Sequence, residues 1–196
     1  MPVIIQNLLL IFCLFLVLTI VITVISHVFI PVPFIPTPKK VVDKILQFAE
    51  IGEGDVFYDL GAGDARILTA AKARFPSILA IGVEFIPTVW LLGKLRIFFS
   101  RKDVKLILGD ARNVNLSNAD CVFVYLLPNM MDQLEQKFDK ELKEGTRIIS
   151  YAFSFKNRKS EKEIAVPWLS GERQLRMYRW SAPKYPNKEE DVVHNN

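Results

Sequence analysis

The most restrictive feature of this chain is an apolar strand that ends in an acid and runs directly into two glycines. Residues 56–58 are apolar, Asp59 follows them directly, and one residue separates Gly61 from Gly63. Glycine lets a backbone turn tightly and approach a ligand, because no Cβ stands in the way. An alanine-rich run after the glycines predicts a helix whose first N–H groups face that ligand. The pattern indicates a nucleotide-cofactor loop, and the acid two residues before the first glycine favours S-adenosylmethionine (SAM) over a dinucleotide.

Strand-like and helical segments alternate around this loop, which is typical of a parallel sheet covered on both faces. We expect strands at 56–60, 79–84, 104–109, 121–126 and 147–153, and helices at 39–49, 65–74, 87–99 and 130–142. Two further strands, 164–168 and 174–180, have no helix between them and predict a hairpin across Ser170 and Gly171. The expected fold is therefore Rossmann-like α/β, with a mostly parallel seven-stranded sheet and an antiparallel C-terminal hairpin. In helix 87–99, the apolar residues at helical spacing are assigned to the core: Trp90, Leu91, Leu92 and Leu95.

Three acids stand at the ends of consecutive expected strands: Asp59, Glu84 and Asp110. Ligands of open α/β sheets bind at the carboxyl ends of the strands, so these side chains are expected to meet. Glu84 follows Gly63 by 21 residues, where a ribose-binding carboxylate is expected. We assign Asp59 to the amino-acid end of the cofactor, Asp110 to the adenine amine, and the Ala111 N–H to a ring nitrogen. The predicted cofactor-binding set is Asp59, Gly61, Ala62, Gly63, Glu84, Asp110 and Ala111.

The glycine spacing argues against a nicotinamide-dependent reductase. A dinucleotide loop has the pattern G-x-G-x-x-G, and Arg66 occupies the place of its third glycine. A metal site is not expected either, because Cys13 and Cys121 are far apart and have no metal-ligand spacing.

The first 30 residues contain no Asp, Glu, Lys or Arg. A helix over residues 8–26 has a length of roughly 28 Å, close to the hydrocarbon core of a bilayer. We therefore predict one transmembrane helix at residues 8–29, which would contact the lipid bilayer. A cleavable secretory signal is less consistent with the sequence, because a basic segment does not precede the apolar run. Lys39, Lys40 and Lys44 follow the helix, so the positive-inside rule places the C-terminal part on the cytoplasmic side, or on the matrix side if the protein is mitochondrial.

With these features in place, the chain resembles the small membrane-anchored class I methyltransferases that modify a lysine of the ATP synthase c subunit, and a related enzyme that modifies the ADP/ATP carrier. The resemblance covers about residues 34–155. Its motifs are the segments 34–38, 59–66 and 127–131, together with Glu84, Asp110 and the apolar anchor. Ala65 departs from the family, in which glycine is more usual, and we expect a helix N-terminus to tolerate it.

The resemblance implies a SAM-dependent protein-lysine N-methyltransferase that acts on a membrane protein and releases S-adenosyl-L-homocysteine (SAH). We expect four parts: an anchor at 1–30, a proline-rich collar at 31–38, a methyltransferase domain at 39–183 and a disordered tail at 184–196. The net charge of +4 suits anionic lipid, and nucleic acid is not an expected partner because no recognition motif accompanies the basic residues.

The acceptor side of the site is assigned less completely. The predicted substrate channel is Pro36, Thr37, Pro38, Tyr125, Leu127, Pro128, Asn129 and Phe155, and the catalytic candidates are Tyr125 and Asn129. An Asn/Asp-Pro-Pro-aromatic tetrad, typical of amide or adenine methylation, is replaced by Leu126-Leu127-Pro128-Asn129. Two alternatives stay open: methylation of a lipid or quinone-like small molecule, and a non-catalytic membrane module that binds SAM or another nucleotide.

Overall fold

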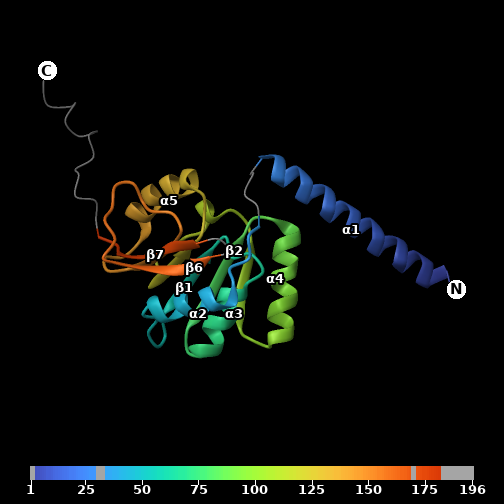
Figure 1. Ribbon diagram of the computed structural model, residues 1–196. Helices are drawn as coiled ribbons and strands as arrows, with labels where there is room; N and C mark the ends of the chain where they lie inside the picture. Colours follow the sequence, from blue (N-terminus) through green and yellow to red (C-terminus); the bar gives the residue numbers. More distant parts are fainter. Residues whose placement is uncertain (1–2, 30–33, 169–170, 182–196) are drawn as a thin grey trace, which may run out of the picture.

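A computed structural model describes residues 3–29, 34–168 and 171–181 of the chain. The seven strands form one sheet in the order β3-β2-β1-β4-β5-β7-β6 (Figure 1). Strands β1 to β5 are parallel, whereas β7 pairs antiparallel with both β5 and β6. The expected Rossmann-like fold with its closing hairpin is thus confirmed. The strands are β1 Val56–Leu60, β2 Leu79–Glu84, β3 Val104–Leu108, β4 Cys121–Val124, β5 Arg147–Tyr151, β6 Lys162–Trp168 and β7 Gly171–Arg179.

Helices cover both faces of the sheet, and each face has its own apolar core. The helices are α1 Val3–Phe29, α2 Lys39–Phe48, α3 Arg66–Arg74, α4 Pro87–Ser100 and α5 Pro128–Glu141, with a short 3-10 helix, η1, at Ala111–Asn113. The α2, α3 and α4 helices pack on one face, and α5 packs on the other with η1 (Figure 1). The expected turn residue Ser170 and the tail at 184–196 lie outside the described residues, as do residues 31–33 of the collar.

Two boundaries near the expected site differ from the sequence prediction. Strand β4 ends at Val124, so Tyr125 and Leu126 lie beyond the strand and not within it. Helix α5 begins at Pro128, because proline lacks the N–H that a first helical residue leaves unbonded in any case. Together the two changes move the connection at the carboxyl end of β4 to residues 125–127 without changing its length, and the chain there passes the neighbouring end of β1.

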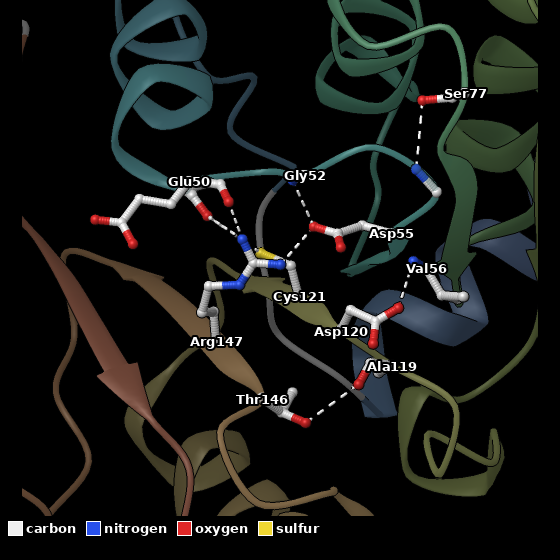
Figure 2. Close-up of polar contacts among 12 residues, drawn as sticks. Glu50, Gly52, Asp55, Val56, Ser77, Ala119, Asp120, Cys121, Thr146 and Arg147 are labelled. Atoms are coloured by element: carbon white, nitrogen blue, oxygen red, sulfur yellow. Dashed lines mark hydrogen bonds and ion pairs between the residues drawn. The ribbon is translucent and has the colours of Figure 1, made fainter.

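At the opposite, amino-terminal edge of the sheet, Arg147 at the start of β5 holds the loop between α2 and β1 (Figure 2). Its guanidinium donates to the carbonyl oxygens of Ala49, at 3.4 Å, and of Glu50, and it pairs with the Asp55 carboxylate. Asp55 also accepts from the Gly52 N–H at 2.7 Å. The loop between α2 and β1 is therefore fixed to the start of β5 by paired charges.

Helix α4 departs from the sequence prediction on its outer side. Helical spacing predicts Leu92 and Leu95 in the core, but both are exposed, whereas Trp90 and Leu91 are half-buried. The prediction is wrong because helical spacing shows that residues share a face, not which face is covered. Helix α1 is the other exposed apolar element: residues Val3–Ile25 are long and apolar enough to cross a membrane, with a mean hydropathy of 3.3.

Candidate active site

A cavity of about 280 Å³ opens at the carboxyl edge of the sheet. The acids from three consecutive strand ends, Asp59, Glu84 and Asp110, all line it. The other members of the predicted cofactor set line it as well: Gly61, Ala62, Gly63 and Ala111. The volume lies near the lower end of the range for small-molecule sites, about 300–1,000 Å³. The strand order changes direction at β1 and β4, and this is the place where open α/β sheets bind ligands.

The glycine loop bends over the end of β2 and is held there by backbone hydrogen bonds. Gly61 and Gly63 have φ of +80° and +58°, values that favour glycine. The Gly61 and Ala62 N–H groups donate to the Val83 carbonyl oxygen, each at 2.9 Å. A Cβ on Gly63 would stand 2.8 Å from the Phe34 ring, which belongs to the cavity wall. Both backbone conformation and space therefore require glycine at this position.

Glu84 fixes the glycine loop by accepting backbone hydrogen bonds. Its carboxylate accepts from the Gly63 N–H at 2.9 Å and from the Ile86 N–H at 2.8 Å. Burial raises the pKa of Glu84, although these backbone hydrogen bonds oppose the rise. A carboxylate has about four lone-pair sites, so two remain for hydroxyl groups of a ligand. The geometry suits a ribose diol that lies over the end of β2.

Asp59 is a buried acid without a counter-charge. It is 2% exposed, and its carboxylate has no hydrogen bond or ion pair within the part of the chain that the structure describes. Burial raises the pKa of Asp59 to about 8, and the negative charges of Glu84 and Asp64 add to the rise. A positively charged ligand would reverse this effect. The ammonium and sulfonium groups of SAM are such charges, so the acid set fits that cofactor.

Asp64 is the contrasting acid of the same loop, because two arginines hold it. Arg66 pairs with its carboxylate at 2.8 and 2.7 Å, and Arg96 of α4 approaches it at 2.6 Å. Burial alone would raise the pKa of Asp64, but the hydrogen bonds from the arginines outweigh burial and lower it. Arg66 also donates to the Thr37 carbonyl oxygen at 2.9 Å, which fastens the collar to the loop. Sequence reasoning missed this network, although the closely spaced charges at 64 and 66 were visible.

Ala65 lies between these groups in a left-handed conformation, with φ 59° and ψ 21°. Such a conformation costs an L-residue roughly 1–2 kcal/mol. The N-terminus of α3 thus accommodates alanine, but at a conformational cost that glycine would avoid. Glycine suits this position because of its backbone angles.

Asp110 lines the cavity but is already engaged. It accepts from the backbone N–H of Arg112 at 2.8 Å and pairs with the side chain of the same residue. The hydrogen bonds from Arg112 lower the pKa of Asp110, so the carboxylate is ionised at neutral pH. An adenine amine would share this carboxylate with Arg112.

The predicted substrate channel is only partly gathered at the cavity. Pro36, Thr37, Tyr125 and Leu127 line it. The remaining members lie elsewhere: Pro38 is the N-cap residue of α2, Pro128 and Asn129 are exposed in the first turn of α5, and Phe155 is buried against Phe138 and Trp180. Tyr125, Phe153 and Arg173 line the cavity together with the collar residues Pro36 and Thr37.

Arg173 is another lining residue that sequence reasoning missed. Its guanidinium carbon lies 4.8 Å from the centroid of the Trp168 ring, and it has no carboxylate partner in the segments described here. Burial raises the pKa of Tyr125, while the charge of Arg173 opposes the rise. The predicted strand 174–180 begins one residue after Arg173. Only the pairing of β7 with β5 shows that this arginine reaches the carboxyl edge.

Comparisons with known proteins agree with this geometry. A family model described as the ANTKMT methyltransferase domain matches residues 59–162. A protein-lysine N-methyltransferase from Saccharolobus islandicus is 33% identical over 144 residues, which is 69% of this chain and 85% of that protein. The lysine N-methyltransferase of the ATP synthase c subunit from Rattus norvegicus is 34% identical over 63% of this chain. The match spans 56% of the rat protein's length.

A solved structure gives the same fold. The RNA methyltransferase from Salinibacter ruber in complex with SAH has a TM-score of 0.68 and 27% sequence identity, and the match covers 77% of this chain and 98% of that one. Other similar structures are less than 20% identical and support the fold alone.

Proposed function

The chain belongs to the ANTKMT methyltransferase domain family, and from this premise we propose that it transfers a methyl group from SAM to a lysine side chain of a membrane protein. The observation that carries the proposal is the cavity in which Asp59, Glu84 and Asp110 meet the glycine loop. The family relatives that match along the chain are named as lysine N-methyltransferases. The names of the relatives support the type of reaction, and the cavity lining supports the choice of residues.

We assign the cofactor to the side of the cavity formed by β1, β2 and β3. Glu84 would accept the ribose hydroxyls, Asp59 would face the ammonium and sulfonium, and Asp110 with the Ala111 N–H would hold adenine. When bound, SAM supplies a methyl group on a positively charged sulfur. The glycine loop contributes orientation, because its backbone is fixed by the hydrogen bonds to Val83 and Glu84.

The acceptor would enter between Tyr125, Phe153 and Arg173. A lysine must be neutral to attack, and its ordinary pKa is about 10.4. Apolar walls disfavour the charged ammonium, and the positive charge of Arg173 disfavours it further. Tyr125 can accept the hydrogen bond that orients the amine. The protein therefore needs no dedicated base for this step, because the neutral amine is favoured before it reacts.

We also propose that α1 anchors the enzyme in a bilayer, with the four-part division 1–30, 31–38, 39–183 and 184–196. The apolar helix and the lysines that follow it, Lys39, Lys40 and Lys44, support a cytoplasmic or matrix position for the domain. Anchoring raises the effective concentration of an acceptor protein in the same membrane. A small, very apolar protein similar to the ATP synthase c subunit is the acceptor we favour.

One observation favours a second acceptor class. Phe34 and Ile35 line the cavity, are partly exposed, and lie close in sequence to α1. A lipid or quinone-like molecule could reach the cavity along this apolar collar.

The test is incubation of purified protein and membranes with SAM labelled on its methyl group. Label in a small apolar protein, at lysine, supports the proposal. Label in the lipid extract supports the second acceptor class, and label in neither fraction would support a non-catalytic SAM-binding module. The Glu84→Ala variant serves as the matched control at a low SAM concentration, because label that comes from this site should fall when cofactor binding is weakened.

A further inference from the structure

Helix α4 presents an apolar face to the outside of the domain. Leu92, Leu95, Phe98 and Phe99 are 51%, 47%, 72% and 77% exposed, and we call them the outer face of α4. Leu92, Leu95 and Phe99 follow Thr88 at spacings of four, three and four residues, so all four share one stripe of the helix. The opposite stripe, with Val89 and Gly93, is buried against the sheet. This arrangement is the reverse of an ordinary surface helix, whose outer face is polar.

The outer face of α4 begins where α1 meets the domain. The hydroxyl groups of Thr23 in α1 and Thr88 in α4 lie 2.9 Å apart and are hydrogen-bonded. Figure 1 shows that α4 forms the side of the domain from which α1 departs. Beyond Thr88, α1 diverges, and the rest of the stripe stays uncovered. The stripe that contains Leu92, Leu95 and Phe99 therefore starts at the residue of α4 that contacts the apolar helix α1.

The charges around this face favour anionic lipid headgroups. The sequence of α4 contains no acid. Lys94 flanks the apolar stripe on one side, and Arg101 and Lys102 follow the helix, whereas Arg96 on the other side is paired with Asp64. Lys94 also extends over the Trp90 ring, 5.8 Å from its centroid, with its stem along apolar surface. An apolar stripe with basic residues beside it is the pattern of helices that lie in a membrane interface.

We propose that the outer face of α4 lies in the lipid interface, as a second membrane contact next to α1. The inference rests on the proposed anchoring by α1. The occupant is lipid because the face is continuous with α1 and is bordered by cations. A second copy of the chain is disfavoured on this face, because the basic residues of the two copies would lie close together and repel each other.

The experiment uses the full chain with Cys13→Ser and single spin-labelled cysteines, reconstituted into phosphatidylcholine vesicles that contain phosphatidylglycerol. Phe99→Cys reports on the outer face, and Leu79→Cys, also an exposed apolar position, is the matched control on β2. Leu14→Cys reports separately on α1. For each label we compare collision rates with oxygen, which concentrates in lipid, and with a water-soluble nickel chelate.

At position 99 we expect oxygen collisions to exceed nickel collisions, as at position 14, and the ratio to invert at position 79. If position 14 is in lipid but 99 resembles 79, the second contact is wrong and the anchor stands. If position 14 is also aqueous, the anchor proposal fails and this inference fails with it. Spin–spin broadening at 99 that persists in detergent would show a second copy on this face and overturn the lipid assignment.

Discussion

Two acids at opposite edges of the sheet, Asp55 and Asp59, differ in whether a cation pairs with them. At the amino edge, Arg147 satisfies Asp55, Ala49 and Glu50, as Figure 2 shows. At the carboxyl edge, Asp59 is buried with no cationic partner in the described chain, and burial raises its pKa to about 8. The comparison teaches that paired charges hold this fold together, whereas the unpaired one marks where a ligand belongs.

The largest expected effect is a loss of stability when the contacts of Arg147 at the amino edge of the sheet are removed. Replacing Arg147 by methionine leaves the half-buried Asp55 carboxylate without its cation and two carbonyl oxygens without this donor. Removing one member of such a pair costs about 3 kcal/mol of unfolding free energy, as measured by denaturant titration. Arg179→Gln, which removes an exposed ion pair to Glu50, is the control and should cost less than about 1 kcal/mol. If the Arg147→Met protein has the same free energy of unfolding as the parent, the contacts of Arg147 do not stabilise the fold.

The next effect addresses cofactor binding at the carboxyl edge. Glu84→Ala removes the acceptor of two backbone N–H groups and the proposed ribose ligand. We expect SAH affinity to fall at least tenfold, or about 1.4 kcal/mol, by calorimetry. Glu84→Gln should lose less, because its amide oxygen can replace one acceptor. Unchanged affinity in both variants would remove Glu84 from the site.

The Asp59→Asn variant tests the unpaired acid directly, because we expect it to raise stability at high pH and to weaken SAM binding. The folded pKa of about 8 exceeds the ordinary value of 3.8, so Asp59 costs stability progressively as pH rises through this window. Without cofactor, the variant should therefore be more stable than the parent at pH 9, by at least about 1 kcal/mol. At pH 4 the two should melt alike, and the variant should bind SAM more weakly. A variant that is less stable at pH 9 contradicts the account of the unpaired acid.

The smallest effect concerns Asn129. The sequence predicts it as a catalytic candidate, but it is exposed and does not line the cavity. Asn129→Ala should change kcat by less than about twofold, under 0.5 kcal/mol. Tyr125→Phe is the comparison variant, because Tyr125 lines the cavity. A large loss of kcat in Asn129→Ala alone would place the acceptor outside the cavity.

The sequence predicted which acids come together at the cavity because the signals for them are local. Asp59, Glu84 and Asp110 each stand at or just after the end of a strand, and the parallel order brings strand ends together without further information. The predicted bounds of strands β1 and β2 are those that the structure has. The acceptor side depends on contacts between distant segments. Arg173 reaches the cavity through the pairing of β7 with β5, and no local pattern around residue 173 indicates that pairing.

The spacing of apolar residues in the sequence also did not predict which of them are buried. The sequence analysis assigns Phe155 to the substrate channel, yet Phe155 packs in the core against Phe138. Leu92 and Leu95 are predicted in the core and are exposed. An apolar residue looks the same in a sequence whether it packs on protein or faces lipid.

Arg96 makes the outer helix and the cofactor loop respond together. From α4 it donates to the Asp64 carbonyl oxygen at 3.0 Å and pairs with the carboxylate of the same residue, one position after Gly63. Arg96 thus joins the proposed lipid-facing helix to the loop proposed to hold the methyl donor. The two proposals together predict that donor affinity differs between detergent micelles and lipid bilayers.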